Sequence, residues 1–211
     1  MKEKSMTYQS ILQSAMEEFG AFGYLQGSIN RICKQCDIAK GTLYLYFKNK
    51  EELYLSCMQE CYWQMEQGLS CIVEKCLQQS CLQKKLQAYF DEFLKLLWKN
   101  PVYGKLYGTV YFGISEPLLS QVYTIGNHLR QVNKNFLMAA FEGVSIQQNI
   151  DKQQAADILL EQCILLMARA HFEKGAHKPL DLAFLQESFR QRLDIFLYGV
   201  LENRAIKEVE F

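Results

Sequence analysis

The sequence has no long hydrophobic run. Its longest apolar stretches, 136–141 and 163–168, have six residues each, whereas a membrane-spanning helix needs about 20. The first five residues are mostly polar and contain no apolar segment that could act as a secretory signal. We therefore expect a cytoplasmic protein that makes no contact with a membrane.

Proline is scarce and absent from the first hundred residues, since the three prolines stand at positions 101, 117 and 179. Apolar residues recur instead at the spacing of one buried helix face. One such stripe comprises Tyr8, Ile11, Leu12, Ala15, Met16, Phe19 and Phe22. Similar stripes follow Leu82–Trp98 and Leu182–Leu201, and no segment of comparable length alternates as a strand would. The pattern predicts an all-α fold of about nine helices.

The chain carries no net charge, because 23 basic residues balance 23 acidic ones. The balance is uneven along the sequence. Residues 28–50 contain five lysines and arginines but only one acidic residue, Asp37. A short basic segment on an otherwise acidic chain indicates contact with a polyanion.

Patterns typical of catalysis and metal binding are missing. Cys33 and Cys36 form a C-x-x-C on the expected buried face of a helix, but no second pair accompanies them, and the three histidines lack ligand spacing. No Ser-His-Asp order, paired catalytic carboxylates or glycine-rich phosphate loop stands out. We therefore expect that the protein is not an enzyme and that it binds no cofactor and no metal. We also expect its eight cysteines to form no disulfides. One hypothesis for the cysteines remains: oxidation of Cys57 or Cys61 alters the helix that contains them.

The stretch 28–53 has the dimensions of a helix-turn-helix. Ser28 is a good N-cap for a helix over Ile29–Cys36, and a second helix fits Lys40–Phe47. In this motif the second helix enters the major groove, where its first residues reach base edges.

The residues of that second helix suit contact with DNA. Gly41 permits close approach, Thr42 and Tyr44 offer hydroxyls, and the Thr42 methyl suits a thymine. Asn49, paired with Glu52, caps the next helix, whose start favours phosphate. The candidate DNA-binding residues are Ser28, Ala39, Lys40, Gly41, Thr42, Tyr44, Leu45, Tyr46, Lys48 and Lys50.

Residues 7–55 resemble the N-terminal DNA-binding signature of TetR-type transcriptional regulators. The matching positions are Phe19, Gly23-Tyr24, Ser28-Ile29, Ile32, Ile38, Lys40-Gly41-Thr42-Leu43-Tyr44, Tyr46-Phe47, Lys50 and Leu53. The resemblance implies a homodimeric repressor that binds palindromic operator DNA and is controlled by a small-molecule effector. Three positions depart from the family pattern: Asp37 replaces a turn glycine, Ala39 an N-capping Ser or Thr, and Leu45 a polar residue.

We predict two domains, a helix-turn-helix domain over residues 1–48 and a larger helical domain over 49–211 for effector binding and dimerisation. The resemblance implies that the last two long helices form the dimer interface. These are expected over Asp151–Lys174 and Asp181–Asn203, and their short connection at 175–179 favours an antiparallel pair. Aromatic and apolar residues of the second domain suit a cavity for an uncharged or cationic apolar effector. The candidates are Tyr89, Phe93, Trp98, Tyr107, Tyr111, Phe112, Phe136, Cys163 and Met167.

An alternative function is that of a helical adaptor that binds a protein partner and has lost DNA binding. Ala39 and Leu45 favour it, since each replaces a residue that would support the DNA-binding role.

Overall fold

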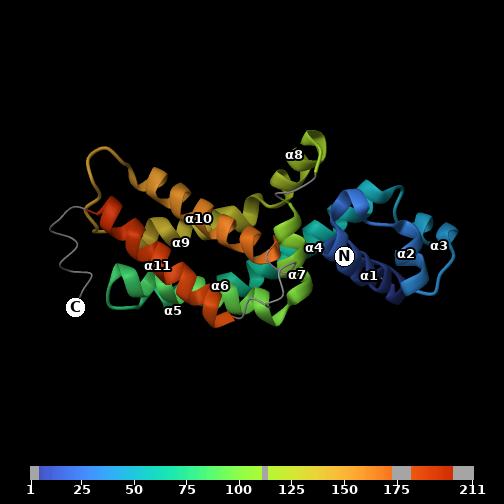
Figure 1. The fold of residues 1–211 in the computed structure, drawn as a ribbon, viewed down its shortest axis with the longest axis horizontal. Coiled ribbons are helices and arrows are strands. Elements are labelled where there is room, and N and C mark those ends of the chain that lie inside the picture. The colour runs from blue at the N-terminus through green and yellow to red at the C-terminus, as the bar shows by residue number, and fades with distance from the viewer. Residues whose placement is uncertain (1–4, 111–113, 173–181, 202–211) are drawn as a thin grey trace. The chain divides into compact units, whose positions relative to one another are not determined.

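The protein is described by a computed structural model that places residues 5–110, 114–172 and 182–201. Within these ranges the chain forms helices, and one isolated bridge pairs Ile146 with Leu201 (Figure 1). The helices are α1 Met6–Gln26, α2 Ile29–Gln35, α3 Lys40–Tyr46, α4 Lys50–Ser70, α5 Val73–Leu77, α6 Leu82–Lys99, α7 Pro101–Thr109, α8 Glu116–Ile125, α9 Asn127–Ala140, α10 Lys152–Phe172 and α11 Leu182–Val200. None of the helices in the described ranges is both long and apolar enough to span a bilayer.

The chain divides into two compact units. The first comprises Met1–Gln64 with Asn100–Asn127, and the second comprises Met65–Lys99 with His128–Phe211. The division therefore falls inside α4 and assigns α7 and α8 to the same unit as α1, α2 and α3. The boundary predicted between residues 48 and 49 does not coincide with this division and stays a prediction.

The first unit is built around α1, which packs against α2 and α7. Its core contains Phe19, Ile32, Leu43 and Tyr54, all fully buried. The Tyr54 ring meets the Phe19 ring edge-on with 5.2 Å between centroids. Gln121 of α8 donates a hydrogen bond to Glu51 at the start of α4, 2.9 Å away. The helix-turn-helix thus rests on a scaffold that includes helices from the middle of the chain.

The second unit buries the stripes predicted for α6 and α11, which pack against each other, as do α10 and α11. Phe90 of α6 lies against Phe189 of α11 with 4.4 Å between ring centroids. Tyr89 stacks on Phe136 of α9 at 3.8 Å, and its hydroxyl donates to Asn133 Oδ1 at 3.0 Å. Aromatic pairs of this kind contribute beyond the area that they bury.

Two expectations about helices need correction. The described ranges contain eleven helices rather than about nine, because a five-residue helix, α5, precedes α6 and because a break at Gly126 separates α8 from α9. Phe22, predicted to lie on the buried face of α1, is half exposed because Gly23 has φ 71° and kinks the end of that helix. The predicted connection at 175–179 lies outside the described residues.

Candidate nucleic-acid interface

Local capping fixes α2 and α3. Ser28 is extended (φ −121°, ψ 118°), and its Oγ accepts a hydrogen bond from the Arg31 amide at 3.4 Å, as predicted for an N-cap. Asp37 has φ 53°, the left-handed conformation that glycine would otherwise supply at this turn. Ala39 is extended and, as predicted, provides no capping side chain to α3. The helix-turn-helix therefore forms despite two of the three departures from the family pattern.

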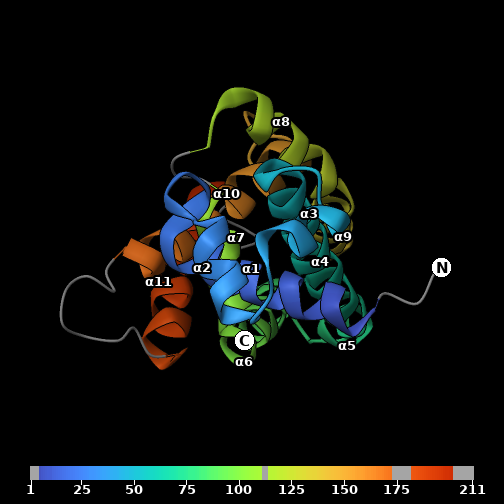
Figure 2. The ribbon, with the colours of Figure 1, turned by 90° about the vertical axis from the view of Figure 1, so that its right-hand side faces the viewer.

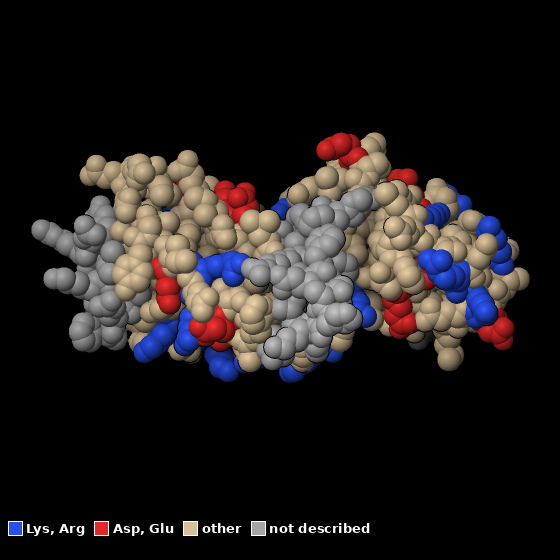
Figure 3. Space-filling view, viewed as in Figure 1, with Lys and Arg blue, Asp and Glu red and all other residues tan. Residues whose placement is uncertain are grey.

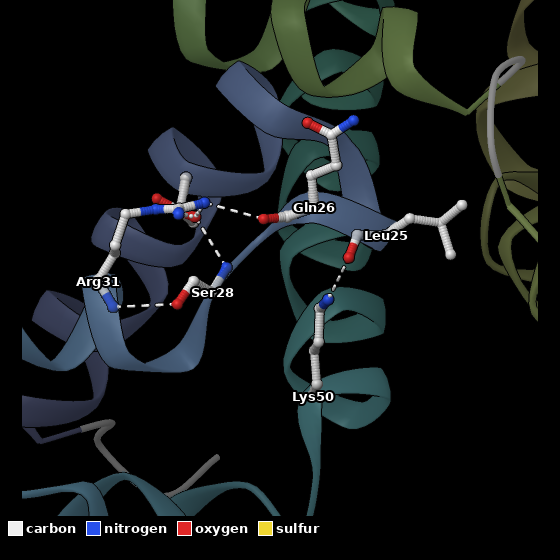
Figure 4. Close-up of polar contacts among 6 residues, drawn as sticks. Leu25, Gln26, Ser28, Arg31 and Lys50 are labelled. Carbon is white, nitrogen blue, oxygen red and sulfur yellow. Dashed lines mark hydrogen bonds and ion pairs between the residues drawn. The ribbon is translucent and has the colours of Figure 1, made fainter.

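A buried carboxylate holds the start of α2. Glu18 lies inside the first unit and accepts hydrogen bonds from the Ser28 amide and from Arg31 Nε, each at 2.8 Å. Arg31 also donates to the Gln26 carbonyl at 2.8 Å (Figure 4). Its guanidinium lies 4.4 Å above the Phe22 ring. The hydrogen bond to Glu18 raises the pKa of Arg31. Sequence reasoning missed Glu18, although its position seven residues after Ile11 places it on the buried face of α1.

The candidate residues of α3 lie mainly outward. Ala39, Lys40, Gly41, Tyr44 and Leu45 are exposed. The Lys40 ammonium lies 5.9 Å from the centre of the Tyr44 ring, and both side chains are at the surface of the helix. Helices α2 and α3 are adjacent in both views (Figure 1, Figure 2).

Three further candidates, Thr42, Tyr46 and Lys50, are partly buried or hydrogen-bonded within the first unit. Thr42 is half-buried. The Tyr46 hydroxyl accepts a hydrogen bond from Ser5 Oγ at 3.2 Å. Lys50 donates to the Leu25 carbonyl at 3.1 Å and lies 4.8 Å over the Tyr24 ring. These interactions give Tyr46 and Lys50 a role in packing besides any role at DNA.

The start of α4 carries the predicted cap. Glu52 N–H donates to Asn49 Oδ1 at 2.8 Å, and Glu52 Oε2 accepts from the Lys48 amide at 2.6 Å. The Lys48 side chain itself is exposed. Partial burial lowers the pKa of the Lys50 ammonium. Figure 3 shows lysines and arginines gathered on the part of the first unit that holds α2, α3 and the start of α4.

The cysteines do not behave alike. Cys33 is buried as predicted, but Cys36 is half-exposed, because it caps the end of α2 and its thiol donates to the Ser10 carbonyl at 3.5 Å. Cys57 and Cys61 are buried, and burial raises the pKa of both thiols far above the usual range. Their burial argues against a sensor at these positions, since the reactive form is the thiolate.

The predicted effector residues are divided between the two units. Tyr89, Phe93, Phe136 and Cys163 are buried in the second unit, where Trp98 is exposed. Tyr107 belongs to the first unit, where its ring meets Tyr62 edge-on at 5.9 Å. Tyr111, Phe112 and the Met167 side chain lie outside the described residues. A groove of about 310 Å³ between α4 and α8 is lined by none of these residues, so the effector site stays a prediction.

Comparison with known proteins agrees with this geometry. The family profile described as bacterial regulatory proteins, tetR family, matches residues 11–57, which contain α2, α3 and the first residues of α4. Residues 11–57 are therefore similar to the corresponding segment of TetR-family regulators. The matched segment is the one that carries the capped helix-turn-helix.

Two kinds of relative accompany the TetR profile. The fatty acid metabolism regulator protein of Bacillus subtilis is 34% identical over 97 residues, which are 46% of this chain and 48% of that protein. The chain thus spans about half the length of this curated relative. Crystal structures of FadR from Bacillus subtilis in complex with stearoyl-CoA (TM-score 0.68, 22% identity) and of a TetR-family regulator from Mesorhizobium loti (TM-score 0.70, 18% identity) share the fold. The matches cover 88% of this chain and 97% of FadR, and 96% of this chain and all of the Mesorhizobium protein.

Proposed function

We propose that this chain is a sequence-specific DNA-binding transcriptional regulator that reads its operator with α3. The observation that carries the proposal is the outward surface of α3, where Lys40, Gly41 and Tyr44 are exposed while Leu43 is buried. A helix of seven residues held by its inner face and presenting short and cationic side chains suits the major groove. The same surface disfavours the adaptor alternative, because a protein partner needs neither the lysines nor the open glycine.

The test is selective binding to duplex DNA. The wild-type chain is incubated at moderate salt with DNA from upstream of its own coding sequence and with a scrambled duplex of equal composition. We expect the specific site to bind at least about 10³-fold more tightly than the scrambled one. Lys40→Ala should weaken binding to both duplexes, whereas Lys84→Ala, an exposed lysine of the second unit, should not. Equal affinity of the wild type for both duplexes would contradict sequence-specific binding and favour the adaptor alternative.

A homodimer is the second part of the proposal. Large apolar side chains remain exposed on α10 and α11, namely Ile158, Leu165, Phe184, Ile195 and Tyr198. Ile158 and Leu165 are seven residues apart, and Phe184 and Ile195 eleven, so each pair shares one helix face. A second copy that covers both faces would form a two-fold four-helix interface. The two α3 helices could then meet successive major grooves about 34–36 Å apart, or more widely spaced ones.

The third part is control by a small molecule bound in the second unit, with repression as the resting output. FadR of Bacillus subtilis, a structural neighbour, was solved with stearoyl-CoA, so long-chain acyl-CoA is the first effector class to test. Its acyl chain is apolar, but its head group is anionic, unlike the uncharged or cationic effector expected from the sequence. We expect stearoyl-CoA to raise the melting temperature of the protein and to release it from operator DNA. Free coenzyme A, which lacks the acyl chain, serves as the control and should do neither.

A further inference from the structure

The orientation of α3 singles out one side chain. Leu43 is fully buried and fixes the inner face of this helix. At about 100° per residue, Gly41 and Leu45 each point about 160° away from Leu43, further than any other residue of α3. Leu45 is 84% exposed, against 43% for Tyr44. Leu45 is therefore the side chain that points most directly away from the core of the first unit.

The space around Leu45 is open. A Cβ at Gly41 would meet no atom within 4 Å among the described residues. Gly41 and Leu45 are four residues apart and thus neighbours on the helix surface. Because helical side chains lean toward the N-terminus, Leu45 extends over the turn that contains Gly41. The outermost strip of α3 is thus one isobutyl group beside a bare backbone.

Such a strip has a specific partner in the major groove. Donors and acceptors of the base edges are read by polar side chains, and a leucine offers neither. The 5-methyl of thymine is the apolar group among the major-groove edges of the four bases. Burying a methyl against an apolar side chain is favourable, whereas placing that side chain over unpaired polar atoms is not.

We propose that Leu45 is a specificity-determining residue that contacts the 5-methyl of a thymine in each operator half-site. The proposal rests on the proposed function, since α3 must enter the major groove. It assigns Leu45 to a base edge, not to the DNA backbone, and so gives the third departure from the family pattern a role of its own.

The experiment removes the methyl alone. A binding site is first selected from a random duplex library with the wild-type chain, and each thymine of that site is then replaced by deoxyuridine. Affinities are measured by fluorescence anisotropy for the wild type, for Leu45→Ala, and for Leu25→Ala as a matched control. Leu25 is also an exposed leucine of the first unit, at 67%, but it belongs to α1.

We expect one thymine per half-site whose replacement weakens wild-type binding about fourfold for each half-site. Leu45→Ala should bind the thymine and uracil duplexes equally, and Leu25→Ala should respond as the wild type does. The proposal is overturned if every replacement affects the wild type and Leu45→Ala alike. Selection that enriches no sequence would instead overturn the proposed function, and this proposal with it, so the two failures are distinguishable.

Discussion

The Arg31 side chain donates from Nε to Glu18 Oε1 across 2.8 Å, and that carboxylate is buried beneath the start of α2. This ion pair reduces the number of positive charges that the basic segment 28–50 can offer to phosphates. The basic segment 28–50 has five positively charged side chains, and Arg31 is one of them. Arg31 is already paired with Glu18 within the first unit. The charge that remains for phosphates comes first from the exposed Lys34, Lys40 and Lys48.

The Glu18 carboxylate should stabilise the first unit. Glu18→Ala leaves the Ser28 amide without its partner, and such an orphaned donor costs about 1–3 kcal/mol. We expect the midpoint of urea unfolding to fall accordingly. Glu17→Ala, which removes an exposed carboxylate from the adjacent position of α1, is the control and should shift the midpoint far less. Equal shifts for both variants would contradict the role assigned to Glu18.

Substitutions of Lys48 and Lys50 should differ in their effect on stability, although both should weaken phosphate binding. Lys48 is exposed, so Lys48→Ala should lower the slope of log affinity against log salt by about 0.9 for each phosphate that is no longer neutralised, and should leave unfolding unchanged. Lys50 holds the Leu25 carbonyl, so Lys50→Ala should weaken binding to all DNA, reduce the salt slope and also destabilise the fold. Salt titrations and urea unfolding of both variants measure the two effects. An unaltered salt slope for both variants would show that neither lysine binds a phosphate.

Gly41 is expected to favour DNA binding while making the free protein less stable than alanine would. Alanine at position 41 meets no described atom and replaces glycine inside a helix, so Gly41→Ala should stabilise the free protein by about 0.5–1 kcal/mol. The added methyl faces the groove and should weaken operator binding. Gly23→Ala provides the contrast, since φ is 71° there and the alanine should destabilise the fold. A Gly41→Ala protein that binds the operator as tightly as the wild type would place the α3 surface away from the DNA.

Local rules account for what could be predicted at this site. The Ser28 cap and the Asn49–Glu52 cap each join residues three positions apart, so spacing alone predicts them. The left-handed Asp37 follows instead from the resemblance, because Asp37 stands where the family has a turn glycine. The burial of Leu43 follows from helical periodicity in the same way. The exposure of the opposite face of α3 can then be predicted from the same periodicity.

Tertiary partners account for what could not be predicted. Arg31 and Glu18 are 13 residues apart, and Lys50 and Leu25 are 25 apart. The spacing of apolar residues does not specify how the helices pack. It therefore cannot tell which of the five lysines and arginines of residues 28–50 have partners inside the first unit. For the same reason, the sequence does not predict that α7 and α8 belong to the first unit.

The exposed faces of α10 and α11 predict the oligomeric state. Ile195 is 74% exposed and, with Phe184 and Tyr198, is one of the large apolar side chains that α11 leaves exposed. Ile195→Lys places a charge in the proposed interface, where burial of an unpaired charge is costly. Light scattering should then show a monomer where the wild type forms a dimer. Ile125→Lys in α8 is the control, because that helix belongs to the first unit; dimers that persist in Ile195→Lys would locate the interface elsewhere.

Thiol reactivity should differ between Cys71 and the buried pair. Cys71 is exposed, whereas Cys57 and Cys61 are buried and burial raises the pKa of both thiols. Because the thiolate is the reacting species, we expect Cys71 to be labelled rapidly by a maleimide in the native protein. Cys57 and Cys61 should be labelled only after unfolding in urea, which mass spectrometry of digested protein resolves site by site. Native-state labelling of Cys57 or Cys61 at the rate of Cys71 would restore the hypothesis of a sensor in α4, because it would require that helix to open without global unfolding.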